Sequence, residues 1–232
     1  DMGTSLKYHK PVSQLIAAYF PTTVKLAALA ALVAWVVGIA CGVLSAVRKD
    51  KLADRLGMGF SLLGVSVPVF MTAMALQYLL AYRLQWFPIQ GTDAGLKSYI
   101  LPAIALGWNS AGSVARLTRS TLLEVLQSDY IDTARAKGRG RAGTVLFHAL
   151  RNALIPVITY VGPMTAYILT GSMVVETVFT IGGLGTQFVK SINNQDYPMI
   201  MATTIFLAVL MVVATLLSDL VYKLVDPRIK LD

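Results

Sequence analysis

The stretch from Ser128 to Pro156 reads SDYIDTARAKGRGRAGTVLFHALRNALIP and is the longest polar, basic interruption in a hydrophobic chain. Asp129 and Asp132 stand where a short helix would begin, and carboxylates suit the positive end of a helix dipole. Lys137 stands in its last turn, and Gly138 is the residue type that commonly follows a helix. The stretch therefore predicts a two-turn helix with its own start and stop.

Helical spacing gives this predicted helix two different flanks. One flank carries Tyr130, Ile131 and Ala134, and the other carries Asp132, Arg135 and Arg139. Isolated helices shorter than roughly 12–15 residues are marginal in water, so this one needs something to pack against. We interpret it as a docking element.

Three glycines in the same stretch form a G-x-G-x-x-G pattern, at Gly138, Gly140 and Gly143. A dinucleotide-binding fingerprint follows a buried strand, whereas this pattern follows a charged helix. The phosphate-binding pattern G-x-x-x-x-G-K-[ST] does not occur in the chain. The glycines therefore do not predict a nucleotide site.

The composition sets the class of protein. The 232 residues are 56% hydrophobic and 14% charged, with a mean hydropathy of +0.64. Such a chain is too apolar for a soluble domain and too interrupted for a single anchor, so we predict an all-α polytopic membrane protein. Membrane topology also explains the net charge of +8 better than nucleic-acid binding does.

Cysteine and histidine are too few for a disulfide framework or a His/Cys metal site, since the chain has only Cys41, His9 and His148. The chain starts at Asp1 without an apolar first segment. We therefore expect that an N-terminal helix of the natural protein precedes it.

Apolar runs predict the membrane spans, because about 20 residues of helix cross the hydrocarbon layer. We expect five spans, at residues 26–47, 56–82, 101–115, 154–175 and 199–225, with a coupling region at 128–152. Small residues such as Gly38 and Gly42 should let a neighbouring helix approach the first span closely. Pro68 should kink the second span.

The basic residues predict the orientation. Fourteen Lys and Arg lie in one set of loops, within residues 48–55, 116–151 and 223–230. The other set holds six: Lys7, Lys10, Lys25, Arg83, Lys97 and Lys190. Cytoplasmic loops carry the excess of Lys and Arg, so the first set and the C-terminus should be cytoplasmic.

The basic stretch resembles the EAA motif of ABC importer permeases, a Glu-Ala-Ala triplet followed by Gly and later by Ile-x-Leu-Pro. Here Asp132 replaces the Glu and Thr133 replaces the first Ala. His148 takes the Ile position, Arg151 takes the Pro position, and the proline is delayed to Pro156. This variant is similar to the B-type permease subunit of the dipeptide/oligopeptide/nickel branch.

The resemblance extends along essentially the whole chain. It includes DMGTSLKY at 1–8, GSMVVETVF at 171–179, GLG at 183–185, DYP at 196–198 and DPRI at 226–229. It implies the type I importer fold, a heterodimer with a homologous C-type permease, two cytoplasmic ATP-binding subunits and an extracellular peptide-binding protein. It also implies that this chain, in a bacterial or archaeal cytoplasmic membrane, is not an enzyme and that ATP and Mg bind to the partner ATPases.

By the same resemblance, the short helix is a coupling helix that docks on an ATP-binding subunit. Its expected docking residues are Tyr130, Ile131, Asp132, Ala134, Arg135, Ala136, Lys137 and Gly138. Gly138 would permit a sharp turn, and Ala134 would keep the contact face flat. The alternative is a basic segment that lies on anionic lipid headgroups.

Polar residues inside predicted spans are candidates for a translocation pathway. Asn109, Ser110 and Ser113 share the third span, and Ser66 lies in the second. The serines have the alternative of pairing helix to helix. Glu176 lies near a span end, where we expect it to be solvated.

The function that these features predict is ATP-driven, binding-protein-dependent import of di- or oligopeptides. Nickel chelates and glutathione are alternative cargoes of the same branch. A secondary transporter is a competing class, but it would need a buried carboxylate pair or a ring of charges, which we do not expect at the span centres. A non-transporting membrane scaffold is the third possibility.

Overall fold

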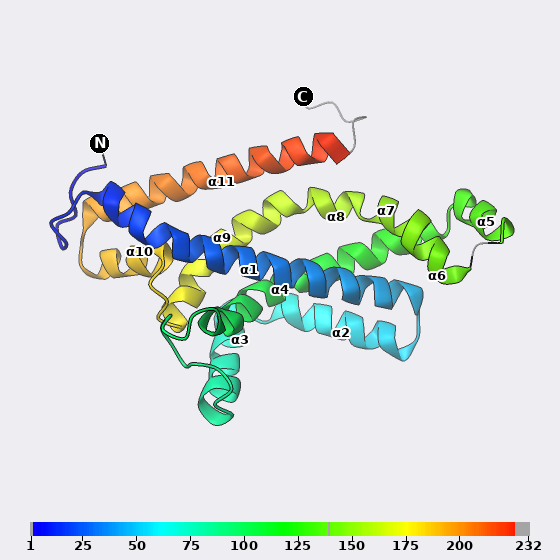
Figure 1. The fold of residues 1–232 in the computed structure, drawn as a ribbon, viewed down its shortest axis with the longest axis horizontal. Coiled ribbons are helices and arrows are strands. Elements are labelled where there is room, and N and C mark those ends of the chain that lie inside the picture. Colours follow the sequence, from blue (N-terminus) through cyan, green and yellow to red (C-terminus); the bar gives the residue numbers. More distant parts are fainter. Residues whose placement is uncertain (1, 139, 226–232) are drawn as a thin grey trace. The chain divides into compact units, whose positions relative to one another are not determined.

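The computed structural model describes residues 2–138 and 140–225, and in these ranges the chain is helical apart from loops and one β-bridge between Thr4 and Pro11 (Figure 1). This confirms the predicted all-α class. The helices are α1 (Val12–Val47), α2 (Leu52–Ser66), α3 (Val69–Leu76), η1 (Gln77–Arg83), α4 (Lys97–Leu126), α5 (Asp129–Ala136), α6 (Arg141–Thr144), η2 (Val145–Ala149), α7 (Leu150–Ala153), α8 (Ile155–Thr159), α9 (Val161–Val178), α10 (Leu184–Asn193) and α11 (Tyr197–Val225).

Helix α1 begins at Val12, well before the predicted span start at residue 26, and it contains Pro21. A proline inside a helix costs about 3 kcal/mol. Val12, Leu15 and Ile16 recur at helical spacing and are all buried. Each contributes about 1.5–3 kcal/mol by burial, so together they outweigh the proline.

The second predicted span is interrupted, because α2 ends at Ser66 and α3 begins at Val69. Pro68 precedes α3 with a ψ of 140°, outside the helical region. A proline also disfavours helical dihedrals at the residue before it, here Val67. The predicted kink at Pro68 is thus a complete break, after which α3 widens into the π-helix η1.

Within the described residues, three helical segments are long and apolar enough to cross a membrane: Val12–Val47, Ala142–Thr159 and Tyr197–Leu217. The count rises to four if α2 and α3–η1 form one broken span. The five predicted spans are therefore not all confirmed. The segment Ala142–Thr159 also begins inside the predicted coupling region, where Leu146 and Phe147 expose apolar side chains.

The chain divides into two compact units. The first comprises Asp1–Val33, Val67–Trp108 and Thr165–Thr215. Its core joins α1, α10 and α11 through Val12, Leu15, Ile16, Leu184, Met199 and Ala202. Helix α10 lies in the sequence between the predicted spans at 154–175 and 199–225, where no helix was expected. Leu184, Phe188 and Ile192 recur at helical spacing, while most of its buried residues are small or polar: Gly185, Thr186, Gln187 and Ser191.

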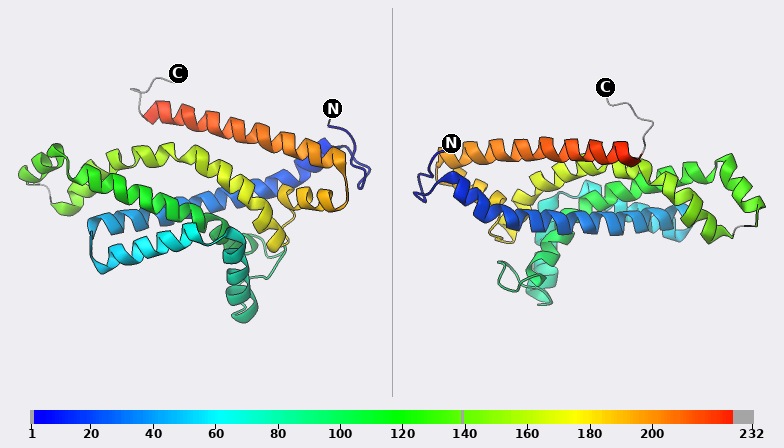
Figure 2. Two further views of the ribbon diagram at one scale, coloured as in Figure 1. Left: turned by 180° about the vertical axis from the view of Figure 1, so that it is seen from behind. Right: turned by 45° about the horizontal axis from the view of Figure 1, so that its top comes forward.

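The second compact unit comprises Ala34–Ser66, Asn109–Met164 and Leu216–Asp232. Here the second half of α1 and α2 form a hairpin, visible in blue and cyan in Figure 2. The same part of α1 packs on α4 at Gly38 and Gly42. A Cβ added at Gly42 would lie 2.6 Å from the Ala115 carbonyl oxygen, so glycine is what permits this close helix contact.

Candidate functional site

The predicted two-turn helix is present as α5, which begins at Asp129 and ends at Ala136. The backbone N–H of Ile131 donates to the Ser128 carbonyl at the start of the helix. Gly138 follows with a φ of +82°, in the left-handed region that glycine adopts without strain. The helix and its stop lie where the sequence places them.

Two residues of the predicted docking flank are buried inside this chain. Ile131 is 0% and Ala134 is 7% exposed. Ile131 belongs to a core cluster that joins α5 to α1, α4, η2 and α7 and contains Ala46, Leu122, Val145, Ala149 and Ala153. Ile131 and Ala134 are therefore not exposed to a partner in this structure, and docking through the other six expected residues stays a prediction.

The opposite side of α5 is available to a partner. Its exposed residues are Tyr130, Asp132, Thr133, Ala136, Lys137 and Gly138, while the side chain of Arg135 lies outside the described part of the structure. Ala136 lies near the centre of this exposed face by helical spacing. The face carries the polar residues Asp132, Thr133 and Lys137 around the small Ala136, with the large side chain of Tyr130 also exposed.

Two hydrogen bonds fix the surroundings of α5. Asn152 Nδ2 donates to Tyr130 Oη at 2.9 Å, which ties α7 to α5. The Thr121 hydroxyl donates to the Ala153 carbonyl at 2.9 Å, which ties α4 to the end of α7. The helix is interrupted between α7 and α8 near Pro156, which lacks an N–H, so a side-chain donor from α4 contributes where the regular ladder breaks.

A bidentate ion pair links α4 to α2 in the same unit. Arg119 Nε and Nη2 donate to the two carboxylate oxygens of Asp54 at 2.6 and 2.7 Å. The backbone N–H of Asp50 also donates to Asp54 at 2.9 Å. Asp54 is only 3% exposed, so this pair is a fixed joint between helices rather than a solvated surface pair. Packing thus connects α5 to α4, and Arg119 connects α4 to α2.

The predicted pathway residues all belong to the second unit but differ in exposure. Ser66 is exposed, and Asn109 and Ser113 are half-buried, so a pathway role for these three stays a prediction. Ser110 is 2% exposed and its Oγ has no accessible surface, so it does not line an open pathway in this structure. A serine does pair two helices, but it is Ser61 of α2, whose hydroxyl donates to the Gly112 carbonyl of α4.

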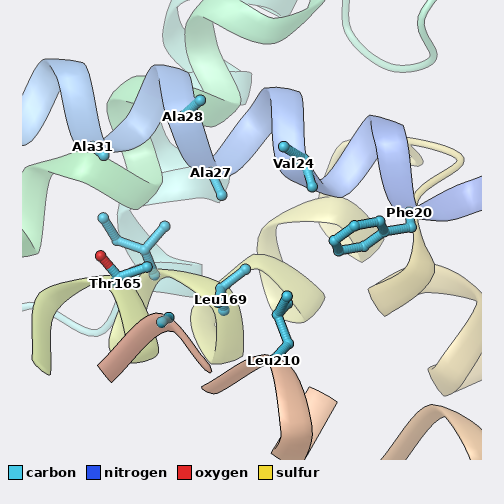
Figure 3. A pocket seen from close by; sticks show the side chains of 10 residues that line it. Phe20, Val24, Ala27, Ala28, Ala31, Thr165, Leu169 and Leu210 are labelled. Carbon is cyan, nitrogen blue, oxygen red and sulfur yellow. The ribbon is translucent and has the colours of Figure 1, made fainter. Parts of the chain in front are cut away.

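None of these four residues lines the apolar cavity of the first unit, which has a volume of about 250 Å³. Figure 3 shows its walls, formed by α1, α9 and α11. Thr165 is the polar side chain among its lining residues, which are otherwise aliphatic or aromatic, including Phe20, Leu169 and Leu210. Such a lining offers no charged group that would pair with the ends of a peptide.

Glu176 was expected to be solvated near a span end, and the structure differs. It is 0% exposed rather than solvated. Its Oε1 accepts a hydrogen bond from the Thr23 hydroxyl at 2.7 Å, and its Oε2 accepts the backbone N–H of Thr186 at 3.0 Å. The Thr23 hydroxyl in turn accepts the N–H of Leu184 at 2.8 Å. Glu176 and Thr23 therefore satisfy the first N–H groups of α10 from outside that helix.

Glycine at positions 183 and 185 leaves the space that Glu176 and Met173 occupy. A Cβ at Gly183 would overlap the Glu176 carboxylate, and one at Gly185 would lie 2.6 Å from the Met173 Cα. Asp54 and Glu176 are both buried, but each is held by hydrogen-bond partners of its own and not by a second carboxylate. The burial of Glu176 was not predicted because its partner Thr23 comes from α1, 153 positions away in the chain.

Comparisons with known proteins place these features in context. The family described as "Binding-protein-dependent transport system inner membrane component" matches residues 38–231. The dipeptide transport system permease protein DppB of Bacillus subtilis (strain 168) is 43% identical over 234 residues, covering 100% of this chain and 75% of that protein. The oligopeptide transport system permease protein OppB of Salmonella typhimurium is 40% identical, covering 99% of this chain and 76% of that protein.

Solved structures show the same fold. A chain of the MetNI methionine ABC transporter, crystallised in inward-facing conformations, matches with a TM-score of 0.76 over 93% of this chain and 98% of that chain, at 18% identity. A chain from the crystal structure of an amino acid ABC transporter with histidines matches with a TM-score of 0.67, also at 18% identity. At this identity the likeness establishes the fold alone.

Proposed function

This chain belongs to the family of binding-protein-dependent transport system inner membrane components, and we propose that it is a permease subunit of an ATP-driven importer of di- or oligopeptides. The similarity to DppB and OppB along the whole chain supports peptides as the cargo. Nickel chelates and glutathione remain alternative cargoes within the same branch.

The proposed assembly contains this chain, a homologous C-type permease, two ATP-binding subunits and an extracellular peptide-binding protein. ATP and Mg bind to the ATP-binding subunits, and no covalent step takes place in this chain. Transport then works by alternating access. Each partner shifts the conformational equilibrium only by the difference in its affinity for the two states.

The observation that supports this proposal is that α5 has one face buried in its own subunit and the other face exposed. Ile131 fastens the helix to the core formed with Leu122, while Ala136 and its neighbours stay exposed. A helix with one face fixed in its own subunit and the other left open is suited to transmit motion from a partner. The Arg119–Asp54 pair extends the mechanical connection from α4 to α2.

Substitution at the centre of the exposed face tests the docking. Ala136→Trp should leave the subunit folded, since Ala136 is exposed, but should block a close-fitting cleft. We expect co-purification of the ATP-binding subunits to fall about tenfold, which corresponds to a loss of about 1.4 kcal/mol. Ala136→Ser is the matched control and should bind normally. Undiminished co-purification and uptake by the Trp variant would refute docking through this face.

The basic residues support the proposed orientation. All described members of the larger basic set fall in the second unit and all six of the smaller set fall in the first, while Arg139, Arg228 and Lys230 lie outside the described residues. The positive-inside rule then assigns the α5 end and the C-terminus to the cytoplasm.

Cysteine labelling tests this orientation. In a Cys41→Ser background, an impermeant maleimide added outside intact cells should label cysteines placed at Asp93 and Asn193. Cysteines placed at Lys51 and Lys137 should react only after the membrane is opened. All four positions are exposed in the structure, so poor accessibility within the subunit does not confuse the result. The opposite labelling pattern would reverse the assignment.

The competing class of secondary transporter finds no support in the two buried carboxylates. Asp54 is held by Arg119, and Glu176 is held by Thr23 and the start of α10. Both carboxylates therefore hold helices together within this chain. A scaffold without transport is distinguished by the Ala136 experiment, because a scaffold has no reason to retain an ATPase.

A further inference from the structure

The structure brings together two sequence motifs that the coupling site does not use, the opening segment DMGTSLKY and the DYP at 196–198. The Ser5 hydroxyl donates to Asp196 Oδ2, and the backbone N–H of Leu6 donates to Asp196 Oδ1 at 3.1 Å. Asp196 is only 1% exposed. The N-terminal segment is therefore clipped to the turn between α10 and α11 by a buried carboxylate.

Further contacts hold the same segment along α10. Tyr8 Oη donates to Gln187 Oε1 at 3.0 Å, and Lys7 Nζ donates to Asn194 Oδ1 at 2.8 Å. Asn194 Nδ2 in turn donates to the Lys190 carbonyl at the end of α10. Residues 6–10 and 190–197 thus form one rigid surface, which we call the terminal platform.

The hydrogen bonds from Ser5 and Leu6 to Asp196 require an ionised carboxyl, which is present at neutral pH. Burial acts to raise the pKa of Asp196, but hydrogen bonds from Ser5 and the backbone outweigh it, so the pKa lies below its ordinary value. A carboxyl with a lowered pKa stabilises the folded state above the unfolded value of about 3.9, and this stabilisation is lost as the pH falls through the lower folded value. The Asp196 carboxyl is therefore ionised, as its hydrogen bonds require, at neutral pH.

The exposed charge of the platform is positive. Among the described residues 2–10 and 184–197, the acidic side chain is Asp196, which is buried, whereas Lys7, Lys10 and Lys190 are exposed. The same ranges also carry exposed amides at 193–195 and three exposed apolar side chains, Leu6, Ile192 and Tyr197. Apolar spots within a polar, charged rim are typical of a protein interface.

We propose that the terminal platform is the docking surface for the binding protein, and that the face of the binding protein which meets it is acidic. This inference rests on the proposed function and on membership of a binding-protein-dependent family. It follows from the charge of the platform and from its rigidity, since a surface that is already ordered loses less entropy on binding.

A lipid surface fits the platform less well. Segments that recognise anionic headgroups carry clusters of about four to eight Lys and Arg, whereas the platform has three lysines. Lys7 is moreover bonded to Asn194. The scattered apolar side chains also do not form the continuous face of an interfacial helix.

The test uses the complete transporter, reconstituted in vesicles with its own binding protein. Lys10→Glu/Lys190→Glu changes the platform, and Arg83→Glu/Lys97→Glu makes the same change in charge at exposed positions of the same unit outside it. We expect the platform variant to raise at least tenfold the binding-protein concentration that half-maximally stimulates ATP hydrolysis. Its basal hydrolysis should equal that of the wild type, and its stimulation should be less sensitive to salt.

Three other outcomes would count against the inference, each in a different way. Equal effects of the two double variants would show that charge anywhere on the unit matters, and not the platform. An unchanged binding-protein requirement, with basal hydrolysis newly dependent on anionic lipid content, would assign the platform to the membrane surface. A wild-type transporter that no binding protein stimulates would overturn the proposed function itself.

Discussion

The Glu176→Ala variant should fail to accumulate as a folded subunit. The substitution removes the acceptor for the Thr23 hydroxyl and for the Thr186 N–H, and both donors are buried. Each unsatisfied buried group costs about 1–3 kcal/mol, so the total loss is about 2–6 kcal/mol. Native stability is itself about 5–15 kcal/mol, so this is a large share of it. Membrane abundance and the thermal unfolding of the purified subunit in detergent measure the effect.

Matched controls separate the buried carboxylate from a general loss of charge. Glu124→Ala removes an exposed acid and should leave abundance unchanged. Gly183→Ala keeps Glu176 but places a Cβ against its carboxylate, whereas a Cβ at Gly182 has no neighbour within 4 Å. Destabilisation by Gly183→Ala but not by Gly182→Ala is expected. A Glu176→Ala subunit as abundant and as heat-stable as the wild type would disprove the role of Glu176 in fastening α10.

The second large effect is expected at Gly42, where α1 meets α4. A Cβ there would lie 2.6 Å from both the Ala115 carbonyl oxygen and the Thr118 Cβ, so the Gly42→Leu side chain has no space. Overpacking costs about 1–3 kcal/mol where side chains can shift. Here the obstacle includes backbone, so we expect the loss to reach the upper end of that range and to be visible as reduced thermal stability.

Gly59→Leu provides the comparison for Gly42→Leu. It is the same substitution in a helix of the same unit, but a Cβ at Gly59 meets nothing within 4 Å. This variant should unfold at nearly the wild-type temperature. If both leucine variants lost stability equally, the cause would be helix propensity or membrane insertion and not the contact between α1 and α4.

The site shows where inference from one sequence stops. Helix-end signals are local, so the acids in the first turn of α5 and the glycine after it located the helix without tertiary information. The flank that stays exposed was not identified from the sequence. An apolar flank predicts burial but not the surface against which it is buried, and Ile131 proved to pack on Leu122 and Ala149 of its own chain.

The sequence by itself determined the class of protein, the place of α5 and the separation of basic residues, because these depend on composition, local capping and counts along the chain. Only the tertiary structure decided that Glu176 fastens α10, that Asp54 pairs with Arg119, and that Ser5 and Asp196 meet. These contacts join residues 65 to 191 positions apart, except for the short link from Glu176 to Thr186. A buried polar group requires a partner, but the partner's position in the chain is fixed by helix packing and leaves no periodic trace in the sequence.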